Sequence, residues 1–100
     1  RVQLLVEANL AGTIHLHDLA ARAALSPYHF ARAFKTSAGV TPRTYVEQRR
    51  IEQAKRLLTE STQSLAQVAM DVGFDTQSRL TSTFKRRTGF TPGEYRRERA

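Results

Sequence analysis

The sequence predicts an all-α fold in which two helix-turn-helix units are joined by one long helix. Apolar residues recur at steps of three and four through most of the 100 residues, and they never alternate strictly as in a half-buried strand. One motif also occurs twice, as FKTSAGVTPRTY from Phe34 and as FKRRTGFTPGEY from Phe84. The repeat indicates two copies of one arrangement, and the pattern of starts and stops predicts about seven helices.

The first three helices are expected in the N-terminal half. One runs roughly from Val2 to Ala11 and ends at Gly12, and a short one covers LHDLAARA, with His15 as a weak cap. Ser26-Pro27 then places a capping side chain before a proline in the first turn. A longer helix over about residues 27–38 follows, and we expect Gly39 to end it.

The middle of the chain is expected to be one continuous helix. Thr41-Pro42 begins PRTYVEQRRIEQAKRLLTE, which would make about five turns and span on the order of 27 Å. Its inward residues are Ala54, Leu57 and Leu58, and Glu52 lies four residues before Arg56, a spacing that favours an ion pair. This helix would connect the two units.

The second unit repeats the first with one residue inserted at its corner. A capping box formed by Ser64 and Gln67 predicts a helix from about residue 65. Asp75 is expected to cap a longer helix over about residues 76–88, which ends at Gly89. A second capping box, Thr91-Pro92-x-Glu94, begins the last helix.

Helical spacing also assigns the faces of the two longer helices. In the first, Phe30, Ala33 and Phe34 form the inward stripe; in the second, Leu80 and Phe84 do so. The repeated tyrosines are expected at the edge of the core. The outward residues are Tyr28, His29, Ala31, Arg32 and Lys35 in the first helix, and Gln77, Ser78, Thr81, Ser82 and Lys85 in the second, with Arg79 at the margin.

Composition restricts the function. The net charge of +7 and the pI of about 10.8 favour a polyanionic partner. The absence of cysteine excludes disulfides and thiolate zinc sites, and no apolar run approaches the roughly 18 residues of a membrane span. We therefore expect a cytoplasmic domain without membrane contact. Because the chain opens on Arg1, we also expect an upstream domain outside this sequence.

The outward faces suit contact with double-stranded DNA. A helix fits the major groove, where arginine can pair with guanine, glutamine with adenine, and tyrosine or alanine can meet a thymine methyl group. Basic residues at other positions of the helices are candidates for phosphate contact. These are Lys35, Arg49, Lys85, Arg86 and Arg87.

Two stretches carry a family resemblance. GFDTQSRLTSTFKRRTGFTPGEYRR resembles the signature of the AraC/XylS family of bacterial transcription regulators, and RRIEQAKRLL resembles its linker helix. The resemblance implies one DNA-binding domain over residues 1–100, divided into a first helix-turn-helix subdomain (1–40), the linker helix (41–60) and a second subdomain (61–100). Its two recognition helices would read successive major grooves of an asymmetric site. The family's base-reading positions fall on Tyr28, Ala31, Arg32, Gln77, Ser78, Arg79 and Ser82.

The resemblance has departures and further implications. Ala24 stands at the first corner, where the family often has glycine, and Ser82 stands where some relatives have arginine. Effector sensing would belong to a separate domain outside this chain. The family that the sequence resembles includes transcription activators.

Other interpretations remain beside this one. Tyr28 could pack against the turn, Arg50 could pair with Glu47, and the arginine pairs beginning at Arg49 and Arg96 could be solvated helix faces. His15, His17 and His29 lack the ligand set that zinc requires, so no metal or cofactor is expected. Without a nucleophile elbow or a phosphate loop, no enzyme activity is expected either. The alternative function is a docking module for RNA polymerase or another acidic partner.

Overall fold

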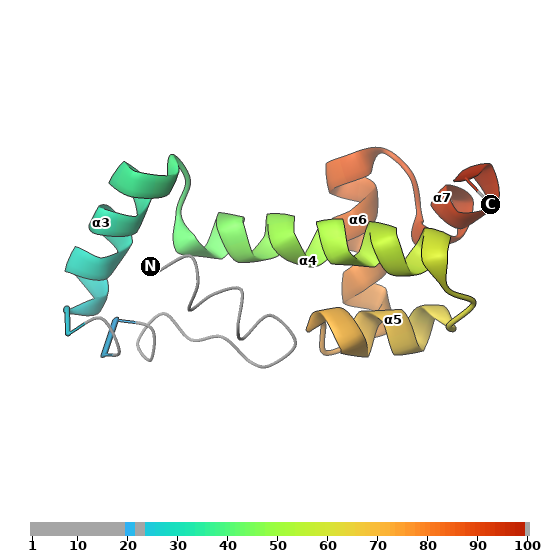
Figure 1. The fold of residues 1–100 in the computed structure, drawn as a ribbon, viewed down its shortest axis with the longest axis horizontal. Helices are drawn as coiled ribbons and strands as arrows, with labels where there is room; N and C mark the ends of the chain where they lie inside the picture. The colour runs from blue at the N-terminus through green and yellow to red at the C-terminus, as the bar shows by residue number, and fades with distance from the viewer. Residues whose placement is uncertain (1–19, 22–23, 100) are drawn as a thin grey trace. The chain divides into compact units, whose positions relative to one another are not determined.

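The computed structural model describes residues 20, 21 and 24–99, which contain helices and no strand. The described helices are α3 (Pro27–Ala38), α4 (Pro42–Glu60), α5 (Leu65–Val72), α6 (Gln77–Thr88) and α7 (Pro92–Arg99) (Figure 1). The all-α prediction is thus confirmed for this part of the chain. Five of the expected helices are described, and the helices expected over residues 2–11 and 16–23 lie outside the described residues, apart from helical Ala20 and Ala21.

Contacts divide the chain into two compact units, residues 1–49 and residues 50–100. The boundary falls within α4, which runs without a break over the stretch expected to form one continuous helix. The first unit therefore contains α3 and the beginning of α4. The second contains the rest of α4 with α5, α6 and α7.

Four helices begin where the sequence places their caps. A hydroxyl oxygen accepts a hydrogen bond from the main-chain N–H three residues later, which satisfies one amide of the first turn. The donor and acceptor pairs are His29 N to Ser26 Oγ (3.2 Å), Thr44 N to Thr41 Oγ1 (3.2 Å), Gln67 N to Ser64 Oγ (3.1 Å) and Glu94 N to Thr91 Oγ1 (3.1 Å).

Two details of capping differ from the sequence-based prediction. Helix α6 begins at Gln77, one residue later than expected, because Thr76 and not Asp75 is its cap: Thr76 Oγ1 accepts from Arg79 N at 3.1 Å. In the box at α5, the side chain of Gln67 donates to Asp71 Oδ1 at 2.8 Å. Of these two boxes, the one at α7 is reciprocal, since Thr91 N also donates to Glu94 Oε1 at 2.8 Å.

The core of the second unit forms between α4, α5 and α6. Ile51, Ala54 and Leu58 supply one face of α4, and the rings of Phe74 and Phe84 lie in the same cluster. Val68, Ala69, Val72 and Leu80 complete the buried set. Partly buried Leu57 packs against it, so the predicted inward stripe of α4 is confirmed. This burial fixes which face of α6 remains outside.

The two copies of the repeated motif form the same aromatic contact. Phe34 and Tyr45 have ring centroids 5.4 Å apart at an interplanar angle of 67°. Phe84 and Tyr95 are 5.2 Å apart at 76°. Both phenylalanines are fully buried and both tyrosines are partly exposed, as expected for a core and its edge. The repeat therefore encodes packing of α3 against the start of α4 and of α6 against α7.

Backbone conformation repeats as well. Gly39 and Gly89 end α3 and α6 in the left-handed region, with φ of 84° and 86°. Ala24, at the corner before α3, has φ 60°, and Gly73, at the corner before α6, has φ 104°. Ala24 therefore adopts the strained conformation that glycine tolerates at the equivalent place.

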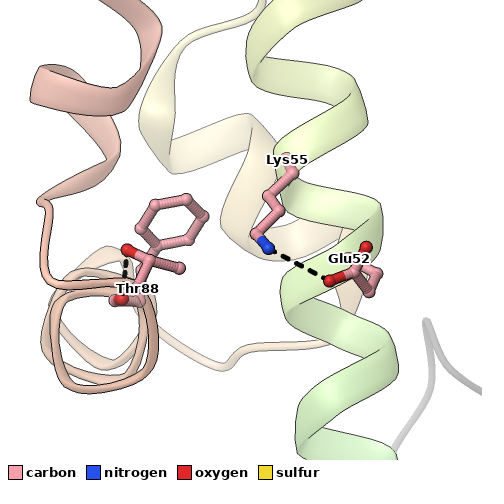
Figure 2. Close-up of polar contacts among 4 residues, drawn as sticks. Glu52, Lys55 and Thr88 are labelled. Carbon is pink, nitrogen blue, oxygen red and sulfur yellow. Dashed lines mark hydrogen bonds and ion pairs between the residues drawn. The ribbon is translucent and has the colours of Figure 1, made fainter. Parts of the chain in front are cut away.

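Two side-chain predictions were wrong. Ala33 is exposed, because its position lies at the edge of the stripe formed by Phe30 and Phe34. Glu52 binds Lys55, three residues later, with Nζ to Oε2 at 3.1 Å, rather than Arg56 (Figure 2). The hydroxyl of Thr88, which is labelled in Figure 2, donates to the carbonyl of Phe84 at 2.8 Å. Within the described ranges, no helix has the length and hydrophobicity needed to cross a membrane.

Candidate nucleic-acid interface

The outer face of α3 presents an ordered pair of aromatic and cationic side chains. Tyr28 is 64% exposed, so it lies outside the core. Arg32 Nη1 donates to its hydroxyl oxygen at 3.1 Å, and the guanidinium carbon lies 5.6 Å from the ring centroid. One turn of helix separates the two residues, which places them on the same face. The guanidinium of Arg32 and the ring of Tyr28 therefore lie together at the surface.

The start of α3 is held by a second local contact. Ser26 Oγ lies 2.7 Å from His29 Nδ1 and also caps the helix. The ring of His29 meets that of Tyr28 at 5.7 Å and 73°. Ala31 is half-buried, and Lys35 is exposed in the last turn. Of the predicted residues of α3, four are thus exposed and Ala31 is half-buried.

Helix α6 presents a polar face in its first turns. Gln77, Ser78, Arg79 and Ser82 are all exposed, whereas Leu80, Thr83 and Phe84 on the other side are buried. Ser82 Oγ donates to the carbonyl of Arg79 at 3.4 Å. An amide and a guanidinium group are therefore both exposed where the helix begins. These are the groups that read purine edges in a major groove.

Basic residues gather at the other end of α6. Lys85, Arg86 and Arg87 lie in its last turn, where positive charge is favoured by the helix dipole. Lys85 and Arg86 are exposed and Arg87 is half-buried. Arg49, the remaining predicted phosphate contact, is half-buried on α4 in the first unit. The structure thus places four of the five predicted phosphate contacts on α3 and α6.

Arg50 has a tertiary environment that its sequence position did not reveal. Its guanidinium carbon lies 5.8 Å from the centroid of Phe74. Partial burial lowers the pKa of Arg50, the nearby charge of Arg79 lowers it further, and the carboxylate of Asp75 raises it. Arginine remains protonated despite such shifts. A fixed positive charge therefore lies beside the beginning of α6.

Arg96 is also more than a solvated arginine. It donates hydrogen bonds to three main-chain carbonyls around the end of α4, and so the reading of that arginine pair as a solvated face was wrong for this residue. By contrast, Arg97 and Arg99 are exposed on α7, and the guanidinium carbon of Arg99 lies 4.6 Å from the Tyr95 centroid. Neither Arg50 nor Arg96 could be assigned these contacts from helical spacing.

Metal chemistry has no candidate site in the described ranges. No group of three or more histidine, cysteine, aspartate or glutamate residues there could hold a metal ion. His29 is described, and His15 and His17 lie outside those ranges.

Comparison with known proteins agrees with this geometry. Residues 19–98 match the family described as "Helix-turn-helix domain". The chain is 41% identical over 88 residues to the HTH-type transcriptional regulator Rv1931c of Mycobacterium tuberculosis, covering 87% of this chain. It is 34% identical over 96 residues to the HTH-type transcriptional regulator ExsA of Pseudomonas aeruginosa, covering 96% of this chain. The chain spans 34% of the length of each of these relatives.

Solved structures share the fold. The DNA-binding domain of AdpA, a global transcriptional factor crystallised with a target DNA, has a TM-score of 0.93 at 33% identity, over 97% of this chain and 87% of that one. The C-terminal domain of AraT, a response regulator from Geobacillus stearothermophilus, has a TM-score of 0.95 at 27% identity, over 99% of this chain and 83% of that one. The chain belongs to the AraC family of transcription regulators, as a helix-turn-helix domain of the type that forms their DNA-binding part.

Proposed function

We propose that this chain binds double-stranded DNA in a sequence-specific manner and thereby regulates transcription, without enzymatic activity. One observation carries the proposal: α3 and α6 each bury an aromatic or aliphatic stripe and leave a face of hydrogen-bonding and cationic residues exposed. A helix with this division can lie in a major groove while its other face stays in the core. The net charge of +7 supplies the attraction to phosphates.

The proposed base contacts are divided between the two helices. Arg32 and Arg79 can each form a bidentate pair with guanine, and Gln77 can do so with adenine. Tyr28 and Ala31 can contact thymine methyl groups, and Ser78 and Ser82 can bond to either kind of base edge. Phosphate contacts are proposed for Lys35, Arg49, Lys85, Arg86 and Arg87.

The two reading faces differ in sequence, and so we propose an asymmetric target. Tyr28, Ala31 and Arg32 have no counterparts of the same chemistry at the equivalent places in α6. In this proposal residues 1–40 and 61–100 form the two reading subdomains, residues 41–60 form the linker helix, and each subdomain occupies one of two successive major grooves. Any small effector would act through a domain outside this chain, in the cytoplasm where the DNA lies.

Footprinting of the purified chain on a DNA fragment selected from a random library tests this proposal. We expect protection of about two helical turns, with poor competition by random DNA. The selected sequence should lack two-fold symmetry. Equal binding to selected and unrelated DNA would contradict sequence reading, and a palindromic selected site would contradict the asymmetric arrangement.

A second candidate function is contact with an acidic protein surface, such as one on RNA polymerase. Positive charge outside the two reading helices favours it: Arg97 and Arg99 are exposed on α7. We expect polymerase to be retained by the immobilised chain after nuclease treatment, and retention to fall when both residues are changed to glutamate. Loss of retention after nuclease treatment of the unchanged chain would show that DNA bridges the two proteins.

A further inference from the structure

Arg50 connects α4 to the corner from which α6 begins. Its guanidinium carbon lies 5.8 Å from the ring centroid of Phe74, within the range of a cation–π contact. Phe74 is only 8% exposed and belongs to the core of the second unit. The cation is thus held against a ring that the core fixes in place. The next residues along the chain are Asp75 and the cap of α6.

Two exposed charges lie within electrostatic range of this cation. Arg79 is in the first turn of α6, and Asp75 is in the corner that precedes it. Partial burial is the main cause that lowers the pKa of Arg50; the charge of Arg79 lowers it further, and the carboxylate of Asp75 raises it. Partial burial of Arg50 reduces the solvent screening of these interactions.

The arrangement affects the side chain of Arg79 more than that of Arg50, because Arg79 is exposed whereas Arg50 is half-buried against Phe74. Asp75 immediately precedes the N-cap Thr76, so its carboxylate is the acidic group nearest in sequence to the Arg79 side chain and could attract it. A fixed cation beside Asp75 offsets the attraction of that carboxylate and repels the second guanidinium. Both effects favour rotamers of Arg79 that point away from the protein.

We propose that Arg50 is a positioning residue for base reading by α6: held against Phe74, it keeps the Arg79 side chain from Asp75 and directs it toward the DNA. This inference rests on the proposed function, and it adds a residue of α4 that does not itself read a base. Loss of the Arg50 charge then reduces discrimination only at the base pair that Arg79 reads.

The test measures binding of the 100-residue chain to its selected site and to variants of that site at each base pair. Arg50→Met removes the charge and keeps an unbranched stem, and Arg50→Lys keeps a charge. Arg56→Met is the matched control, because Arg56 is exposed on the same helix. For Arg50→Met we expect discrimination at the Arg79 base pair to fall about fivefold or more, since a bidentate pair is worth about 5- to 150-fold. Arg50→Lys should retain most of it, and Arg56→Met all of it.

Double variants separate positioning from other roles. In an Arg79→Ala background, Arg50→Met should cause no further loss at that base pair, because the two changes act through one contact. Asp75→Asn combined with Arg50→Met should restore part of the discrimination. Equal weakening at every base pair, with a flatter salt dependence, would make Arg50 a phosphate contact and overturn the inference. A lowered unfolding temperature with unchanged discrimination would reduce Arg50 to a structural role and also overturn it.

The design distinguishes this inference from the proposed function. If the unchanged chain shows no sequence preference, the proposed function fails and the inference fails with it. If Arg79→Ala costs discrimination at one base pair and Arg50→Met does not, the proposed function stands and only the inference is refuted.

Discussion

Arg96 Nε donates a hydrogen bond to the main-chain carbonyl of Leu58, 38 residues earlier, at 3.1 Å. The same guanidinium bonds the carbonyls of Gln63 at 2.6 Å and Ser61 at 3.3 Å. Carbonyls at the end of a helix lack partners within it, and here α7 supplies them for the last turn of α4 and the segment beyond. One side chain thus fixes the path of the chain between α4 and α5.

Replacing Arg96 should therefore destabilise the second unit. Arg96→Lys keeps the charge but cannot reach three carbonyls with one ammonium group. We expect a loss of about 1.5–3 kcal/mol in the free energy of unfolding, the range for hydrogen bonds to charged groups. Urea denaturation followed by circular dichroism measures it. Arg97→Lys, at an exposed neighbour, should change stability little; equal losses in both variants would contradict the assignment.

Relief of backbone strain at Ala24 should stabilise the first unit. A residue with a side chain in the left-handed region costs roughly 1–2 kcal/mol, and glycine avoids this cost but adds freedom to the unfolded chain. Ala24→Gly should therefore raise the free energy of unfolding by up to about 1 kcal/mol. Gly73→Ala, at the equivalent corner with φ 104°, is the reciprocal control and should destabilise the protein. A loss of stability in Ala24→Gly would refute the prediction.

The capping box of α7 should make stability depend on pH. The hydrogen bond from the Thr91 amide lowers the pKa of Glu94 below its ordinary value of 4.5, against a smaller opposing effect of desolvation. Because the folded-state pKa is the lower one, this contribution is present above about 4.5 and is lost as the pH falls through the folded-state pKa. Denaturation of the unchanged chain and of Glu94→Gln at pH 7 and pH 3 should show a stability difference that shrinks in acid. A difference of equal size at both values would contradict a role for the charge.

Substitution of a proposed base contact and of a proposed phosphate contact should have different effects on DNA binding. Arg32 and Lys85, which are both exposed, allow the comparison. Arg32→Ala should relax base preference in one half of the site, at a cost of about 1–3 kcal/mol. Lys85→Ala should weaken binding to all sequences alike and reduce the salt slope by about one. Competition binding at several salt concentrations measures both. Identical behaviour of the two variants would show that the division between base and phosphate contacts is wrong.

Local sequence determined most of the secondary structure. A cap acts on amides three residues away, and the stripe of a helix depends on spacing within a few turns, so Ser26, Thr41 and Ser64 mark their helices without tertiary information. The wrong cap predicted for α6 is also a local error: Asp75 and Thr76 are adjacent, either side chain can cap a helix, and Thr76 is the one that does.

The candidate site was predictable as a face and not as a set of contacts. Spacing placed Arg32 and Gln77 outside because Phe30 and Leu80 had to lie inside. It could not show that Tyr28 binds Arg32 at the surface. Long polar side chains can choose among several neighbours, and periodicity gives only their direction.

The sequence by itself determined the two copies of one packing unit, since the repeated phenylalanines and tyrosines meet within each copy at similar distances and angles. Only the tertiary structure decided the partners of Arg50 and Arg96, as well as the strained conformation of Ala24. The reason is the range of the interactions involved. Caps and helical stripes depend on residues within a few positions, whereas a guanidinium binds whatever carbonyl or ring the folded core brings near it.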